Sequence, residues 1–272
     1  MQDHHMNPRA MVASILHNRY LIIKSIQREV YGRYRGSFLG ILWSFFTPLL
    51  MLAVYTFVFS VVFKARWGGG SGSKTEFALL LFAGLIVYNL FAECINRAPS
   101  LIMSNNHYVT RVVYPIEIFP VINLGSAIFH MAISLVVWLL AYTVLFGMPH
   151  ATTLYLPVIL FPLGFFILGL CWLLSSLGVY LRDVNQIISI ITTALLFLSP
   201  IFYSADRLPP QFQIIMHINP LSGVIEQTRN ALFWGIGPSP SLLALQYVGA
   251  ALVCCLGFAW FQKTRKGFAD VI

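Results

Sequence analysis

Long uninterrupted apolar runs constrain this chain more than any other feature. Six runs of about 20 residues or more are long enough for a helix to cross a bilayer. They lie near Phe38–Phe63, Phe77–Ala98, Ile116–Phe146, Thr153–Tyr180, Val184–Tyr203 and Ser241–Gln262. Only helices and closed barrels satisfy their backbone groups in lipid, and the runs are continuous rather than alternating. They therefore predict an all-α polytopic membrane protein with six transmembrane helices.

Composition supports the same class. The chain is 58% hydrophobic and only 10% charged, whereas water-soluble domains are about 25% charged. Its four cysteines fall inside apolar runs, without the spacing of a metal site or a disulfide framework. The prediction is a single transmembrane domain over residues 1–272, with no metal and no nucleic acid as a partner.

The distribution of basic residues predicts the orientation. If the N-terminus lies inside, only five of the 17 Lys and Arg residues fall in outer segments, and the other twelve fall in inner ones. The five are Lys64, Arg66, Lys74, Arg207 and Arg229. Because basic residues are enriched in cytoplasmic segments, both termini are predicted to be cytoplasmic. Spans one to five then occupy residues 38–203, and span six occupies residues 241–262.

Two segments outside the spans carry their own patterns. Residues 11–31 place apolar side chains such as Val12, Ile15 and Ile26 at helical spacing, which predicts an amphipathic helix at the inner membrane interface. Anionic lipids or a docking partner could equally account for it. Residues 204–240 are too short to cross twice, so they predict re-entrant or interfacial helices on the outer side. There Asn219 and Pro220 resemble a helix start.

The stretch "WGGGSGSKTEF" nearly spells a phosphate-binding loop. Ser73 occupies the place of the second glycine, and an apolar run precedes the stretch where a buried strand is required. A flexible linker between two membrane helices fits better.

Polar residues near the membrane form no catalytic constellation. Glu93 and Arg97 are spaced to pair along one helix turn, as are Glu226 and Arg229. Asp183 is placed to cap the following helix, with Gln186 completing a capping box; the other interpretation of this turn, which also holds Arg182, is a gate.

His130 lies inside a predicted span beside Ser126 and Ser134, where a packing hydrogen bond is the simplest interpretation. Trp43 and Tyr55 suit either an aromatic belt or a lining that stacks on sugars.

The best-defined pattern begins at "QREVYGRYRGSFLGILWSFFTPLLMLAVYTFVFSVVF". It continues through "RVVYPIEIFPV" and "YLRDVNQIISIITTALLFLSPIFY", and ends in "INPLSGVIEQTRNALF". In order, spacing and layout this resembles the ABC type-2 permeases that export lipid-linked polysaccharides, including O-antigen and teichoic acid. The resemblance covers nearly the whole chain.

The resemblance implies a half-transporter in the bacterial inner membrane. Two copies would form a conduit for a lipid-linked polysaccharide, and two separate ATPase subunits would bind ATP and Mg²⁺. This chain would itself be no enzyme and bind no cofactor. Other cargoes, such as teichoic acid, a drug or a small lipid, and a membrane-embedded glycolipid transferase are the alternatives.

The resemblance also implies candidate site residues. ATPase docking falls on residues 11–31 and 100–114, and the docking and coupling candidates are Arg28, Arg33, Arg35, Ser104, Asn105, Asn106, His107 and Arg111. The gate or conduit candidates are Trp43, Tyr55, Glu93, Arg97, Arg182, Asp183, Glu226 and Arg229.

Overall fold

The computed structural model describes residues 8–58, 73–110, 114–203, 213–214, 216 and 218–271. Within these ranges the chain forms helices joined by short turns, and no strand. The α-helices are α1 (Pro8–His17), α2 (Arg19–Tyr34), α3 (Trp43–Tyr55), α4 (Lys74–Arg97), α5 (Asn106–Thr110), α6 (Phe119–Phe146), α7 (Leu156–Tyr180), α8 (Val184–Leu198), α10 (Pro220–Arg229), α11 (Pro240–Thr264) and α12 (Phe268–Val271). The prediction of an all-α protein is confirmed.

Five helical stretches of the described chain are long and apolar enough to cross a membrane. They are Gly40–Val58, Thr75–Ser100, Ile116–Phe146, Ala151–Tyr180 and Pro240–Gly267. The run expected at Val184–Tyr203 appears instead as α8, an apolar helix of 15 residues. It ends at Leu198, and the next residue, Ser199, is extended, because a residue before proline is disfavoured in a helix.

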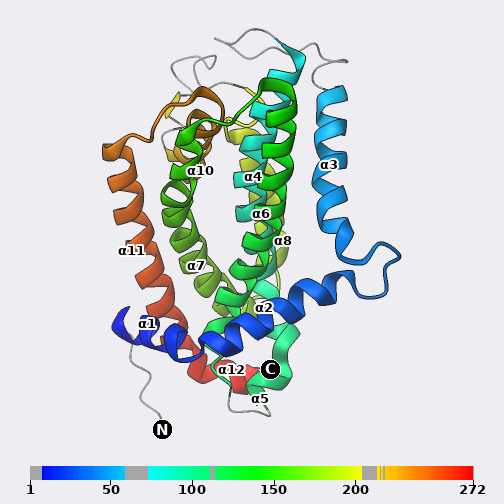
Figure 1. Ribbon diagram of the computed structural model, residues 1–272. Coiled ribbons are helices and arrows are strands. Elements are labelled where there is room, and N and C mark those ends of the chain that lie inside the picture. Colours follow the sequence, from blue (N-terminus) through cyan, green and yellow to red (C-terminus); the bar gives the residue numbers. More distant parts are fainter. Residues whose placement is uncertain are drawn as a thin grey trace.

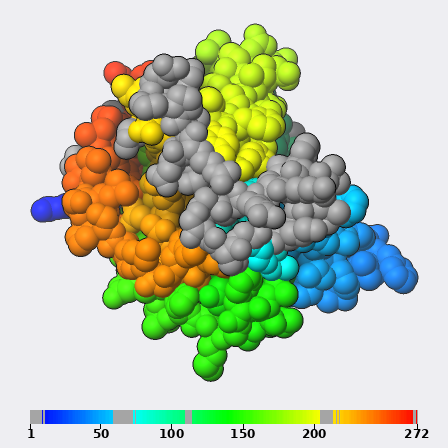
Figure 2. Space-filling view, turned by 90° about the horizontal axis from the view of Figure 1, so that it is seen from above, coloured from blue at the N-terminus to red at the C-terminus, as the bar shows by residue number. Residues whose placement is uncertain are grey.

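The long helices stand side by side, and the short N-terminal helices lie across one end of them (Figure 1). We call this the α2 end; it also carries α5, α12 and the C-terminus. The opposite end, which carries α10, is the α10 end. Viewed onto the α10 end, α3 and α8 lie at the periphery, and α11 lies on the side opposite α3 (Figure 2).

The centre of the bundle is α4, where 89% of the residues in an 18-residue apolar stretch are buried. Beside it, α7 and α11 meet backbone to backbone. A Cβ atom on Gly169 would lie 2.4 Å from the carbonyl oxygen of Val253, and one on Gly257 would lie 2.0 Å from that of Gly169. Small residues of this kind allow membrane helices to approach closely.

The N-terminal segment departs from the single helix expected over residues 11–31. It forms two helices, α1 and α2, which meet at Asn18, where the side-chain amide donates to the carbonyl of Ser14 (2.8 Å). Ile22 is buried against the bundle, whereas Leu16 and Ile23 are exposed. The apolar residues therefore face two directions, toward the bundle and away from it.

Local expectations at two helix starts had different outcomes. Asn219 begins α10 and accepts a hydrogen bond from the backbone N–H of Leu221 (2.9 Å), as predicted. Asp183 occupies the equivalent place before α8 but makes no capping hydrogen bond, so the predicted capping box with Gln186 is wrong. The turn there is held by backbone bonds such as that from the Gln186 N–H to the Asp183 carbonyl (3.0 Å).

Most of the glycine-rich stretch lies outside the described residues. The helical stretch before it runs from Gly40 to Val58, and α4 begins at Lys74.

Candidate functional site

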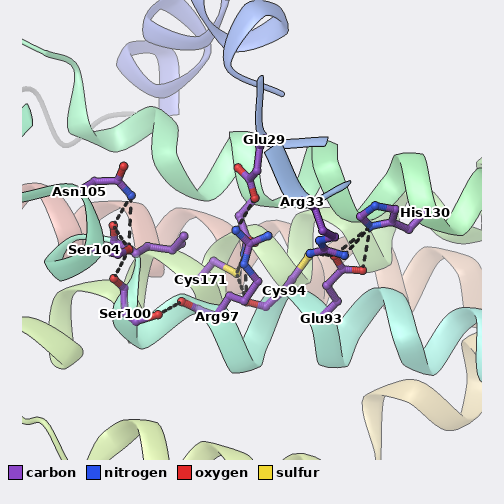
Figure 3. A network of polar contacts seen from close by, with 12 residues as sticks. Glu29, Arg33, Glu93, Cys94, Arg97, Ser100, Ser104, Asn105, His130 and Cys171 are labelled. Carbon is purple, nitrogen blue, oxygen red and sulfur yellow. Dashed lines mark hydrogen bonds and ion pairs between the residues drawn. The ribbon is translucent and has the colours of Figure 1, made fainter. Parts of the chain in front are cut away.

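Charged side chains of α2 and α4 are paired across the two helices at the α2 end. Arg33 contacts Glu93 (Nη2 to Oε1, 2.6 Å), and Arg97 pairs with Glu29 (Figure 3). In each helix the acid precedes the base by four residues, and the first residue of each pair contacts the second residue of the other. We call these two contacts the crossed ion pairs. The pairing predicted within α4, between Glu93 and Arg97, is wrong because α2 offers each of them a partner.

His130 extends the crossed ion pairs to α6. Its Nδ1 atom lies 3.0 Å from Glu93 Oε1 and 3.0 Å from Arg33 Nη1. The ring of Tyr34 packs edge-on against the imidazole. Ser134 donates to the backbone carbonyl of His130 and not to its ring. The imidazole is therefore held by charged groups from two other helices, and the expected packing bond within its own helix is replaced by these contacts.

A second set of polar contacts ties α1 and α2 to the same end. Arg28 donates to the Tyr108 hydroxyl (2.9 Å), and this hydrogen bond raises the pKa of Arg28. Ser14 donates to Glu117 Oε1, whose other oxygen accepts from Arg265 (both 3.0 Å). The C-terminal end of α11 is thereby connected to α1 through one carboxylate.

A polar pocket of about 290 Å³ lies between α2 and the end of α4. Ser25, Arg28, Glu29, Arg97, Ser100, Leu101, Ser104, Asn105, Phe119 and Ile122 line it. It brings together three of the docking candidates, Arg28, Ser104 and Asn105, with the gate candidate Arg97. One of the crossed ion pairs, that of Glu29 with Arg97, forms part of its wall.

Two docking candidates of the pocket also bond to their own backbone, and the others are exposed. Ser104 donates to the carbonyl of Ser100 (2.7 Å) and Asn105 to that of Leu101 (2.9 Å), so both side chains close their own helical turns. Asn106 and His107 lie on α5 with exposed side chains, and Arg35 is exposed after α2. Arg111 lies outside the described residues.

The gate candidates do not form one site. Trp43 and Tyr55 lie on α3, and Arg182 and Asp183 lie exposed in the turn between α7 and α8. Glu226 is exposed on α10.

Arg229 is the gate candidate with the deepest burial, at 3% exposure. Its guanidinium donates to three backbone carbonyls, those of Leu80 (2.8 Å), Ile201 (2.7 Å) and Pro200. The predicted interaction with Glu226 is present as an electrostatic attraction. These three carbonyls belong to α4 and to the turn after α8.

A larger cavity of about 650 Å³ opens at the α10 end between α7, α10 and α11. Apolar side chains such as Leu163, Phe166 and Leu245 form most of its wall. Glu226 and Gln246 add polar groups, and Gln246 accepts a hydrogen bond from Gln227 (3.1 Å).

Sequence reasoning missed several of these residues. Glu29, Glu117 and Arg265 stood outside the candidate sets, yet each makes an ion pair between elements far apart in the chain. The spacing of Glu29 and Arg33 by four residues on a helix was the one available signal, because such a pair lies on one face. Among the described residues, no group of three His, Cys, Asp or Glu side chains could hold a metal ion.

Comparison with known families decides the class of the chain. The family model described as ABC-2 type transporter matches residues 20–233.

This chain belongs to the ABC-2 type transporter family.

Relatives that match most of this ABC-2 chain have names that describe export or transport. It is 26% identical over 266 residues to the O-antigen export system permease protein RfbA of Myxococcus xanthus, covering 96% of this chain and 99% of that one. It is 24% identical over 254 residues to a protein of the same name from Klebsiella pneumoniae, covering 93% and 95%. It is 25% identical over 236 residues to the polysialic acid transport protein KpsM of Escherichia coli, covering 83% and 89%. The resemblance drawn from the sequence is confirmed.

The family match includes both the crossed ion pairs and Arg229, since residues 29 to 229 all lie within it. It does not assign a role to any of them.

Proposed function

We propose that this chain is the permease subunit of an ATP-driven exporter that moves a lipid-linked polysaccharide of the O-antigen type across the bacterial inner membrane. The observation that carries the proposal is the similarity to O-antigen export permeases over 93% and 96% of this chain. A polar glycan cannot enter hydrocarbon unaided, because each unsatisfied polar group costs several kcal/mol, on the order of 2–7. A protein conduit is therefore required.

The proposed topology has six spans with the α2 end in the cytoplasm, and α8 is the fifth. Its course beside α4 supports this. Thr192 donates to Asn96 near one end of α4 (2.8 Å), and Arg229 bridges Leu80 near the other end to Pro200. The chain from α8 to Ile201 thus accompanies α4 for most of its length. The basic residues of α1 and α2 suit the cytoplasmic side.

The position of α1 and α2 fits a helix pair at the membrane interface. Val12, Leu16 and Ile23 are exposed apolar side chains at 48–61% exposure. In this position they contact the lipid boundary, while the crossed ion pairs hold α2 to the bundle.

Two copies of the chain form the proposed conduit, and two separate ATPase subunits that bind ATP and Mg²⁺ dock at the α2 end. Exposed apolar side chains on α3 and α8 support a second copy. They include Phe46, Leu50, Val54, Ile187, Ile190 and Phe197. Only 6% of the α3 span is buried within one copy. The docking residues in this proposal are those lining or flanking the polar pocket, Arg28, Ser104 and Asn105, with His107.

Deletion of the gene, followed by location of the glycan, tests the proposal. We expect polymer to accumulate on its lipid carrier inside the cell, and a plasmid copy of the chain to restore surface polymer. Complete absence of the polymer would instead indicate the transferase alternative. Normal surface polymer in the deletion strain would contradict both.

The identity of the cargo is tested in the same strain. Extracting the retained lipid fraction and identifying its head group separates an O-antigen-type glycan from teichoic acid, and from a drug or small lipid. The similarity to a polysialic acid transport protein makes an acidic polysaccharide the second cargo to look for.

A further inference from the structure

We propose that Glu29, Arg33, Glu93 and Arg97 are positioning residues that transmit movement of α2 to the bundle during transport. The inference rests on the proposed function, because the movement in question is the one that a docked ATPase imposes on α2. It goes further by naming the mechanical link, namely the crossed ion pairs.

Two contacts spaced one turn apart restrain a helix more than one contact does. A single ion pair leaves α2 free to pivot about that point. The contacts of Glu29 with Arg97 and of Arg33 with Glu93 lie one turn apart on both helices. Any rotation or sliding of α2 must therefore stretch one of them or move α4.

Apolar packing supplies a fixed point beside the crossed ion pairs. The side chain of Ile26 fills the space above Gly125 of α6, where a Cβ atom would lie 2.2 Å from Ile26 Cδ1. Ile22 and Val30, on either side of it, are also buried. The apolar contact locates α2 on α6, and the ion pairs determine how α2 turns relative to α4.

The ion pairs are suited to a link that must survive movement. Their side chains are 21–37% exposed, so water still reaches them. Partial burial strengthens the attraction relative to a fully exposed pair. It also avoids the large desolvation penalty of a pair in the dry interior. His130 adds a connection from the same charges to α6.

The helix α4 connects the crossed ion pairs to the α10 end of the molecule. It is the most buried of the five spans, and its carbonyl at Leu80 accepts a hydrogen bond from Arg229 of α10. A displacement of α4 at Arg97 is thus transmitted along α4 to α10, which borders the 650 Å³ cavity at the α10 end. Coupling of this kind requires a demonstrated energetic link between the sites.

A charge swap provides that demonstration. The chain is reconstituted with its ATPase in liposomes, and export and ATP hydrolysis are measured for Glu29→Arg, Arg97→Glu and the double variant. Each single variant brings like charges together, so we expect export to fall at least tenfold while hydrolysis stays within twofold. The double variant restores attraction and is expected to recover at least a third of the export.

Lys263→Glu is the control, because Lys263 is an exposed base on α11 and lies outside α2, α4 and the two segments expected to dock the ATPase. We expect it to leave both rates unchanged. The ratio of export to hydrolysis separates transmission from folding, since a folding defect lowers both together. If charge reversal lowers the amount of folded protein, the neutral variants Glu29→Gln and Arg97→Gln are used. Their ratio of export to hydrolysis is compared with that of the unaltered chain.

Two results would overturn the inference without touching the proposed function: full export by the single variants, or a double variant no better than the singles. A lack of export by the unaltered chain with its ATPase would instead contradict the proposed function. A loss of hydrolysis parallel to the loss of export would show that the four residues serve docking or folding and not transmission.

Discussion

The two ends of the bundle use charge in different ways. At the α2 end, acids and bases from different helices face each other and remain 21–37% exposed in the crossed ion pairs. At the α10 end, the buried guanidinium of Arg229 holds backbone carbonyls of two other segments. Partly exposed ion pairs can separate and re-form, because water solvates the separated charges. When a buried donor moves away, its carbonyl acceptors are left without a hydrogen bond. The α2 end is therefore built for adjustable contact, and the neighbourhood of Arg229 for a fixed one.

The helices α7 and α11 also differ between the two ends, in how closely they pack. Toward the α2 end they touch through Gly169 and Gly257. Toward the α10 end they separate around the 650 Å³ cavity. Four stability measurements test this division, and each has a control that should behave differently.

Arg229→Met is expected to have the largest effect. It removes the donors for three buried carbonyls, and stranding each costs about 1 kcal/mol, so we expect a loss of about 3 kcal/mol in unfolding free energy. Denaturant unfolding in detergent measures it. Arg182→Met, at an exposed arginine, should change the same quantity by less than about 0.5 kcal/mol. Equal effects of the two variants would remove the distinction between the ends.

Gly257→Ala is expected to have the second-largest effect on the unfolding free energy. The added methyl group would overlap the Gly169 carbonyl oxygen, and overpacking of this kind costs about 1–3 kcal/mol. The control is Gly249→Ala on the same helix, which meets nothing within 4 Å. It should be neutral or stabilising by up to about 1 kcal/mol, because alanine favours helix. A large loss at Gly249 would show that the helices are equally close at both ends.

Glu117→Gln addresses the ion pair between Glu117 and Arg265, whose side chains are 13% and 14% exposed. We expect a loss of about 1.5 kcal/mol, as for hydrogen bonds to charged groups. Thermal unfolding of the purified chain measures it. Asp183→Asn, at an exposed carboxylate without a capping bond, should leave the midpoint unchanged; a shift there as large as at Glu117 would argue against a special role for the partly buried pair.

Tyr108→Phe should have the smallest effect. It deletes the acceptor of the Arg28 hydrogen bond, which is exposed, and for such a bond about 0.5 kcal/mol is expected. The same unfolding assay checks it, and the same change at Tyr88, whose hydroxyl donates to the carbonyl of Thr192 in the buried interior (2.8 Å), should cost more. The reverse order would contradict the argument from burial.

The sequence predicted the fold class well because long apolar runs have few solutions in lipid. It also predicted the start of α10 at Asn219, since a cap depends on neighbours in the chain. It failed where partners come from elsewhere. Glu93 and Arg97 are well spaced for each other, yet α2 supplies a partner for each.

The burial of Arg229 could not be predicted from the sequence either. A basic residue in a short segment suggests an exposed side chain, and only the tertiary structure brings the carbonyls of Leu80 and Ile201 to it. The length of α8 was also not predicted, because the apolar run continues past Pro200 whereas the helix stops before it. Hydrophobicity alone does not indicate where a helix stops.

The carbonyls held by Arg229 have a consequence for how the α10 end could open. Because one guanidinium spans α10, α4 and the turn after α8, these three pieces must shift as a single body. The connection from α10 to α11 lies outside these bonds. There Gly235 adopts a left-handed conformation (φ 67°) that few other residues tolerate. A swing of the whole body about this glycine would change the volume of the neighbouring cavity without breaking a single buried hydrogen bond of Arg229.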